Sequence, residues 1–145
     1  MKGVSLFCSA GIAETYFKEH DINIVVASEL IPKRAELHSW LNKDCHTICG
    51  DITDDAIFEQ VANEALAQDC KFLIATPPCQ GMSTLGKKEY TTDKRNYLVF
   101  YALDMIDRCD FNYILIENVP KFLNMYFPYK GDLLHLMDIL KDKYS

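Results

Sequence analysis

The chain has 145 residues, of which 49% are hydrophobic and 25% are charged, and its formal net charge is −6 at pH 7. The length favours one domain with a core of moderate size, and the composition is typical of a globular, soluble chain. The acidic balance excludes a protein that binds nucleic-acid phosphate over its whole surface. Any such contact must therefore come from a local patch or from another chain.

Hydropathy and cysteine usage indicate a cytoplasmic protein. No apolar run approaches the roughly 18 residues of a membrane-spanning helix, and no signal-peptide pattern precedes the first predicted strand. The six cysteines, at positions 8, 45, 49, 70, 79 and 109, have no disulfide spacing, so we expect reduced thiols. Cys45, His46 and Cys49 could form half of a zinc site, but no matching pair follows them, so we predict no metal.

Apolar, β-branched runs alternate with amphipathic segments along the chain. The runs predict strands over residues 3–7, 23–27, 47–49, 71–75 and 113–116. The segments predict helices over residues 12–19, 32–41, 53–66, 96–106 and 132–140, with caps at Thr53 or Asp54 and at Asp132. This alternation is typical of a parallel sheet with helices on both faces. We therefore predict an α/β fold with a doubly wound, Rossmann-like sheet of about five strands, forming a single subdomain over residues 1–145.

Polar or small residues follow each predicted strand. Ser9 to Gly11 follow the first strand, Glu29 the second, Asp51 the third, Cys79 the fourth and Glu117 the fifth. In open α/β sheets ligands bind beyond the carboxyl ends of the strands. We therefore expect all these residues to meet at one edge of the sheet.

The segment after the fourth predicted strand presents a cysteine. Pro77 and Pro78 restrict the backbone immediately before Cys79, and Gly81 lets the chain pass close to a bound molecule. Such a loop can present a reactive thiol to a substrate. The alternative is that Cys79 is an ordinary buried thiol.

Two motifs resemble a known family. Pro78-Cys79-Gln80 with Ser83, followed downstream by Glu117-Asn118-Val119, is similar to the catalytic signature of the cytosine-C5 DNA methyltransferases. The resemblance covers residues 4–145. It implies the S-adenosylmethionine-dependent methyltransferase fold and methyl transfer from S-adenosylmethionine to C5 of cytosine in DNA, with S-adenosylhomocysteine as the product.

The resemblance also implies catalytic roles. Cys79 would add to C6 of cytosine and thereby make C5 nucleophilic. Glu117 would bond the N3 edge of the base as a general acid, a role that burial and a raised pKa would favour. Asn118 would bond the backbone of the cysteine loop. The target base would have to be flipped out of the duplex.

The turn Leu6–Gly11 resembles the family's first motif, which wraps the methionine part of S-adenosylmethionine. By the same resemblance Glu29 would accept the ribose hydroxyls, Asp51 would bond the adenine amino group and Ile52 would pack on the ring. Solvated acids, helix caps and a merely structural turn are the alternatives. The predicted cofactor-binding residues are Phe7, Ser9, Ala10, Gly11, Ile12, Glu29, Leu30, Asp51, Ile52, Pro78 and Leu98. Ser9 and Ile12 stand where the family usually has glycine.

The segment after Cys79 is locally basic. Between Cys79 and Asn96 it has four basic and two acidic residues, a local charge of +2 in an acidic chain. The segment 86–95 has no apolar periodicity, which predicts a loop. We expect this loop to contact DNA, although a solvated surface loop would look similar. The predicted contact residues are Gln80, Ser83, Lys87, Lys88 and Arg95.

The family's pattern extends past this chain. We find no Gln-x-Arg-x-Arg segment, no target-recognition region and no C-terminal helix that would complete the cofactor pocket. We therefore expect a sheet truncated after about five strands, with the fifth as an open edge. We also expect a chain that is inactive on DNA by itself, being either one half of a split enzyme that needs a complementary subunit or a truncated piece that lacks its second half. Two alternatives stay open: a tRNA cytosine-C5 methyltransferase, and a non-catalytic module that binds S-adenosylmethionine or a partner.

Overall fold

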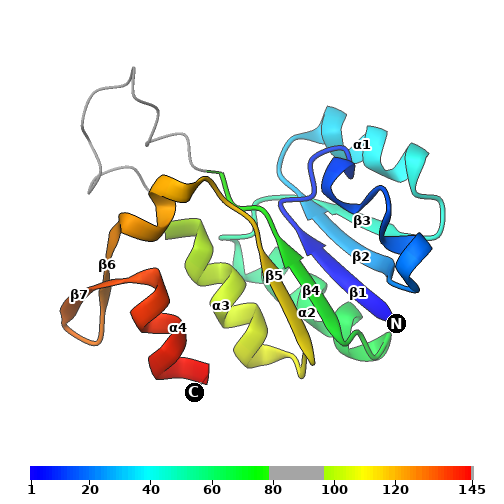
Figure 1. Cartoon of the computed structure of the whole chain (residues 1–145). Coiled ribbons are helices and arrows are strands. Elements are labelled where there is room, and N and C mark those ends of the chain that lie inside the picture. Colours follow the sequence, from blue (N-terminus) through cyan, green and yellow to red (C-terminus); the bar gives the residue numbers. More distant parts are fainter. Residues whose placement is uncertain (79–96, 145) are drawn as a thin grey trace. The chain divides into compact units, whose positions relative to one another are not determined.

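The computed structural model describes residues 1–78 and 97–144 (Figure 1). The chain divides into two compact units. Unit 1 comprises Met1–Pro77 and Leu98–Glu117, and unit 2 comprises the described residues of Pro78–Tyr97 and Asn118–Ser145. The sequence predicts a single subdomain over residues 1–145, and that stays a prediction.

Unit 1 contains five parallel strands, which are β1 (Lys2–Leu6), β2 (Asn23–Glu29), β3 (His46–Cys49), β4 (Phe72–Ala75) and β5 (Tyr113–Ile116). Their order in the sheet is β3-β2-β1-β4-β5 (Figure 1). The chain builds the sheet outward from β1 to β3, and then returns to add β4 and β5 on the other side of β1. Because all the pairs are parallel, the carboxyl ends of the strands meet at one edge. The predicted doubly wound parallel sheet is confirmed.

Three helices pack on this sheet, which are α1 (Pro32–Leu41), α2 (Asp55–Ala67) and α3 (Leu98–Arg108). Helix α1 contacts β2 and β3, α2 contacts β2 and α3, and α3 contacts β4. Two helix starts follow the sequence signals. Pro32 lies in the first turn of α1, and the Asp54 carboxylate caps α2 by accepting a hydrogen bond from the Ala56 N–H at 2.8 Å. No helix in the described part of the chain is long and apolar enough to span a membrane.

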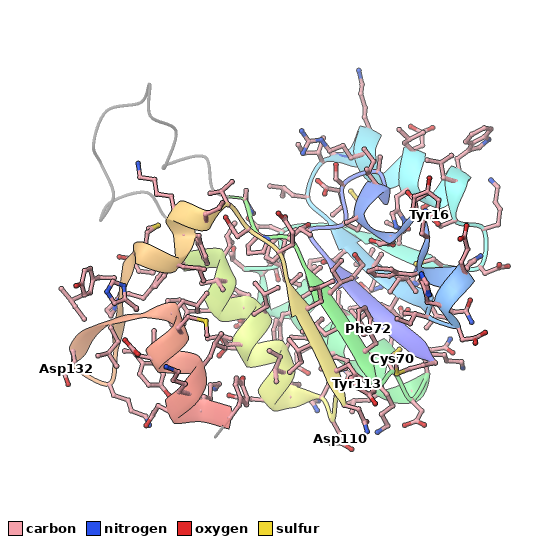
Figure 2. The ribbon with its side chains drawn as sticks, viewed as in Figure 1. Tyr16, Cys70, Phe72, Asp110, Tyr113 and Asp132 are labelled. Carbon is pink, nitrogen blue, oxygen red and sulfur yellow. The ribbon has the colours of Figure 1, made fainter. Side chains whose placement is uncertain are left out.

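The central strands are buried on both faces, as an all-parallel sheet requires. On one face Phe72 and Ile74 of β4 lie in an apolar cluster, and the Phe17 ring packs edge-on against Phe72 with 5.4 Å between the centroids. Figure 2 labels Phe72 on its strand. Successive side chains of a strand point to opposite faces. The other face therefore receives the neighbouring residues, of which Val4, Val26 and Leu73 are fully buried.

The predicted helix over residues 12–19 is wrong. Two short 3-10 turns stand there instead, η1 (Ile12–Glu14) and η2 (Phe17–His20). Between them Tyr16 leaves helical geometry, with φ −104° and ψ 5°. The Thr15 hydroxyl donates to the Ile12 carbonyl at 2.9 Å, so a side chain takes an acceptor that a continuous helix would use. β-Branched and aromatic residues in succession also have low helix propensity.

Strand β5 lies at the edge of the sheet. Among the described residues it pairs with β4 and with no other strand. Its first three residues, Tyr113, Ile114 and Leu115, are exposed (Figure 2 labels Tyr113). Within this part of the chain the expected open edge is therefore present.

Helix α1 buries small and polar residues and exposes large apolar ones. Ala35 and His38 are buried, whereas Leu37, Trp40 and Leu41 are exposed. These three side chains are three and four positions apart, so they form one outward stripe. The side of the helix that is buried therefore carries the small side chain of Ala35 and the hydrogen-bonded ring of His38.

Unit 2 contains a hairpin that sequence reasoning missed. Its elements are η5 (Pro120–Asn124), β6 (Tyr126–Tyr129), β7 (Asp132–His135) and α4 (Leu136–Tyr144). The helix predicted to start at Asp132 starts at Leu136. Lys130 and Gly131 form a two-residue turn with φ values of 51° and 92°, which suits a type I′ hairpin and commits residues 132–135 to a strand. The Phe122 and Phe127 rings, 5.3 Å apart, lie at the core of this unit.

Candidate functional site

The turn after β1, residues 7–11, which we call the β1 loop, has an unusual backbone. Phe7, Ser9 and Gly11 all have positive φ, at 61°, 52° and 81°. The Gly11 N–H donates to the Cys8 carbonyl at 2.9 Å, which closes the turn. Non-glycine residues adopt this conformation at a cost, so the surroundings must hold them there. The loop follows the central strand β1, where the strand order reverses and open α/β sheets bind ligands.

Glu29, at the end of β2, is tied to the β1 loop. Its side chain is buried, and its two oxygens accept hydrogen bonds of 2.9 Å each, from the Ser9 N–H and from the Ile31 N–H. A carboxylate can accept about four hydrogen bonds, so acceptor capacity remains for the hydroxyls of a ribose. Glu29 can therefore shape the loop and bind a ligand with the same group.

The end of β3 lies beside the end of β2. The Gly50 N–H donates to the Glu29 carbonyl at 3.0 Å. Asp51 is exposed, and its Oδ1 accepts from the Thr53 N–H at 2.9 Å, which leaves its other oxygen for a ligand. Ile52 is buried, whereas Leu30 is 59% exposed. The predicted ribose and adenine residues are thus brought to adjacent strand ends.

The other predicted cofactor residues differ from one another in burial and in the unit to which they belong. Ala10 and Leu98 are half-buried, and Leu98 is the first residue of α3. Ile12 is 80% exposed. Pro78 is half-buried and belongs to unit 2. Their roles in cofactor binding stay predictions.

Thr76 is a site residue that sequence reasoning missed. Its N–H donates to the Leu6 carbonyl at 3.2 Å, and its hydroxyl donates to the Phe7 carbonyl at 3.0 Å. These two bonds join the end of β4 to the β1 loop. A threonine just before a Pro-Pro-Cys segment is the available sequence signal, but its partner is 69 positions away and could not be read from the sequence.

Gly11 lies on a floor made by α1. A Cβ at Gly11 would lie 3.0 Å from the His38 Cδ2 and 2.8 Å from the Asn42 Nδ2. A real Cβ contact is seldom so short, so the loop approaches the helix closely because residue 11 has no side chain. His38 and Asn42 were not predicted as site residues, since nothing in the sequence links them to the loop.

The predicted catalytic and DNA-contact segment falls outside the described residues. Cys79, Gln80, Ser83, Lys87, Lys88 and Arg95 all lie in it. Their roles stay predictions.

The strand that leads to Cys79 is next to the strand that leads to Glu117. Ala75 pairs with Ile116, and the Glu117 N–H donates to the Ala75 carbonyl at 3.0 Å. The Glu117 side chain is exposed. The Asn118 Oδ1 accepts from the Val119 N–H at 2.9 Å. The catalytic roles of Glu117 and Asn118 stay predictions.

Several other thiols are poor nucleophiles. Burial raises the pKa of Cys45 to about 12 and that of Cys70 to about 11, and it also raises the pKa of Cys8. These thiols stay protonated at neutral pH, and a protonated thiol does not attack. The described cysteines are all free thiols, and the described residues contain no group of three or more His, Cys, Asp or Glu side chains that could hold a metal ion.

Comparison with known proteins shows to which family the sequence belongs and which solved structures have a similar fold. The model of the C-5 cytosine-specific DNA methylase family matches residues 1–138. The type II methyltransferase M1.HgaI of Avibacterium volantium is 44% identical over 99% of this chain and 41% of its own length. The type II methyltransferase M.XorII of Xanthomonas oryzae is 29% identical over 81% of this chain and 28% of its own length. A mutant of Spodoptera frugiperda DNMT2 has a similar fold, with a TM-score of 0.63 at 22% identity over 85% of this chain and 37% of the other.

Proposed function

Because the chain belongs to the C-5 cytosine-specific DNA methylase family, we propose that it is the cofactor-binding and catalytic part of an enzyme that methylates C5 of cytosine in DNA. One observation carries the proposal. The strand ends that hold the β1 loop, Glu29 and Asp51 lie at the same edge of one parallel sheet as those that lead to Cys79 and Glu117. A cofactor site and a base site would then be neighbours.

The residues at this edge fit S-adenosylmethionine. The β1 loop is a tight turn, and Glu29 keeps acceptor capacity for two ribose hydroxyls. Asp51 has a free oxygen for an adenine amino group. S-Adenosylmethionine, once bound, supplies an electrophilic methyl group and leaves as S-adenosylhomocysteine.

The base half of the proposal assigns chemistry to two side chains. The Cys79 thiolate adds to C6 of a flipped cytosine, which makes C5 nucleophilic toward the methyl group. Glu117 bonds the N3 edge of the base and shares a proton with it as negative charge develops there. An exposed Glu117 can reach a base that arrives from outside the protein. Loss of the C5 proton and of the thiolate then restores the ring.

We also propose that activity on DNA requires a target-recognition region, supplied by a missing second half or by a partner subunit. The chain spans 41% of the length of M1.HgaI and 28% of that of M.XorII. Its net charge of −6 does not favour DNA binding by this chain alone. The names of these relatives support a role in restriction-modification.

The test combines the purified chain with the part of M1.HgaI that lies outside the matched region, added in trans. Calorimetry measures S-adenosylmethionine binding by the chain alone. Duplex DNA containing 5-fluorocytosine then traps a covalent adduct, because a fluorine at C5 blocks the final elimination. A tRNA substrate runs in parallel, and Cys79→Ser is the control variant.

The proposal predicts cofactor binding, and an adduct with DNA that needs both polypeptides and Cys79. Cofactor binding with no adduct would favour a non-catalytic module, and an adduct with tRNA alone would favour the RNA alternative. Robust methylation of duplex DNA by the chain alone would refute the need for a second polypeptide.

A further inference from the structure

A buried carboxylate–imidazole pair lies beneath the β1 loop. Glu14 of η1 and His38 of α1 face each other, with 3.2 Å between the Glu14 Oε2 and the His38 Nε2. The side chain of His38 is fully buried and that of Glu14 is 4% exposed. Nothing in the proposed chemistry uses either residue.

The pair is the centre of a longer hydrogen-bonded chain. The Ser5 hydroxyl of β1 donates to the Glu14 Oε1, and the His38 Nδ1 lies 2.7 Å from the Thr47 hydroxyl of β3. Four elements of unit 1 are thereby joined: β1, η1, α1 and β3. Each side chain in this hydrogen-bonded series has a partner, as buried polar groups require.

Stability alone is a weak reason for such a pair. Removing two ionisable groups from water is expensive, and apolar residues of similar volume often serve a core equally well. The place of the pair is more informative. Glu14 is three residues after Gly11, and the edge of the His38 ring forms the floor on which Gly11 rests.

We propose that Glu14 and His38 are positioning residues that hold the β1 loop in the shape that S-adenosylmethionine requires. The inference rests on the proposed function. Glu29 fixes Ser9 and Thr76 fixes Phe7, so these two contacts hold the upstream part of the loop. The Glu14–His38 pair fixes its downstream end, between Gly11 and η1.

A set of variants at Glu14 separates position from charge. Glu14→Gln keeps the shape of the side chain. Its carbonyl can accept from the Ser5 hydroxyl, and its amide can donate to the Nε2 of His38 when the ring carries its proton on Nδ1. Glu14→Ala removes both contacts, and His38→Ala removes the floor. Val61→Ala is the control, because Val61 is a fully buried residue of α2 outside this network.

Two measurements are made on the whole chain. Hydrogen exchange measures the protection of the amides of residues 8–12, which needs no cofactor. Calorimetry measures the dissociation constant for S-adenosylmethionine. For Glu14→Ala and His38→Ala we expect faster exchange in the loop and affinity lowered about tenfold or more. We expect Glu14→Gln and Val61→Ala to keep both values within about threefold of the parent.

Three results would contradict the inference or the function on which it rests. If loop exchange is unchanged in Glu14→Ala and His38→Ala, or is faster while affinity is unchanged, the inference is overturned. If Glu14→Gln loses as much affinity as Glu14→Ala, charge matters and positioning is overturned. If the parent chain does not bind S-adenosylmethionine, the proposed function loses its cofactor, whereas the exchange data still decide whether the pair holds the loop.

Discussion

The Thr76 hydroxyl donates a hydrogen bond of 3.0 Å to the Phe7 carbonyl. This contact links the segment that leads to Cys79 with the loop that leads to the cofactor residues. Phe7 has a positive φ of 61°, so its peptide needs external support. Thr76 is therefore a point where the two halves of the proposed site depend on each other.

Replacing Thr76 by valine tests this link. Thr76→Val removes the donor at nearly constant volume, so we expect a loss of about 1 kcal/mol in the free energy of unfolding. We also expect S-adenosylmethionine affinity to fall by roughly fivefold. Chemical denaturation and calorimetry give the two values. Thr76→Ser keeps the hydroxyl and should restore affinity, and a serine variant as weak as the valine variant would contradict the role of the hydrogen bond.

Replacing Glu29 by glutamine tests the two hydrogen bonds that its carboxylate accepts from the backbone. Each Glu29 oxygen accepts from an N–H, of Ser9 or of Ile31, but a glutamine side chain has only one oxygen. One partly buried N–H then faces an amide donor, which should cost about 1 kcal/mol in the free energy of unfolding and also weaken cofactor binding. The exposed Glu19→Gln is the matched control, and equal effects of the two variants would sink the prediction.

Replacing Gly11 by alanine tests the close approach to α1. A Cβ there would crowd Asn42 and His38, and the φ of 81° disfavours any side chain. We expect a loss of about 2 kcal/mol or more in the free energy of unfolding, measured by denaturation. Gly131→Ala has a φ of 92° with no atom within 4 Å, so it should show only the smaller backbone cost. If the two alanines cost the same, the floor beneath Gly11 imposes no constraint.

The buried thiols predict how stability depends on pH. Burial raises the pKa of Cys45 from 9.0 to about 12, so between these values the folded chain keeps a proton that the unfolded chain loses. The free energy of unfolding should therefore fall as pH rises above about 9, by up to roughly 1.4 kcal/mol per pH unit for each such thiol. Cys45→Ala should flatten this slope in urea titrations from pH 8 to pH 11. The control Val61→Ala, which removes no titratable group, should leave the slope unchanged.

Local patterns predicted the sheet well. The five apolar runs became the five strands, and Asp54 and Pro32 began their helices, because these features depend on residues close in sequence. The convergence of Glu29 and Asp51 followed from the rule that parallel strands share a carboxyl edge. The family resemblance added the roles, which no local pattern contains.

The helix missed at residues 12–19 has a local cause, whereas distant partners decided the other misses. Residues 132–135 were expected in a helix, but pairing with β6 across the Lys130-Gly131 turn made them a strand. Glu14 and His38 looked like ordinary helix residues, since their pairing spans 24 positions.

The outward stripe of α1 has a practical consequence. Trp40 is the single tryptophan of the chain, it is 66% exposed, and it lies two residues after His38. Indole fluorescence responds to the polarity around the ring, so the tryptophan emission of this protein comes from the solvent-facing side of α1, opposite the buried His38. The molecule therefore carries an intrinsic optical reporter of α1, with which the unfolding of this helix can be followed without an added dye.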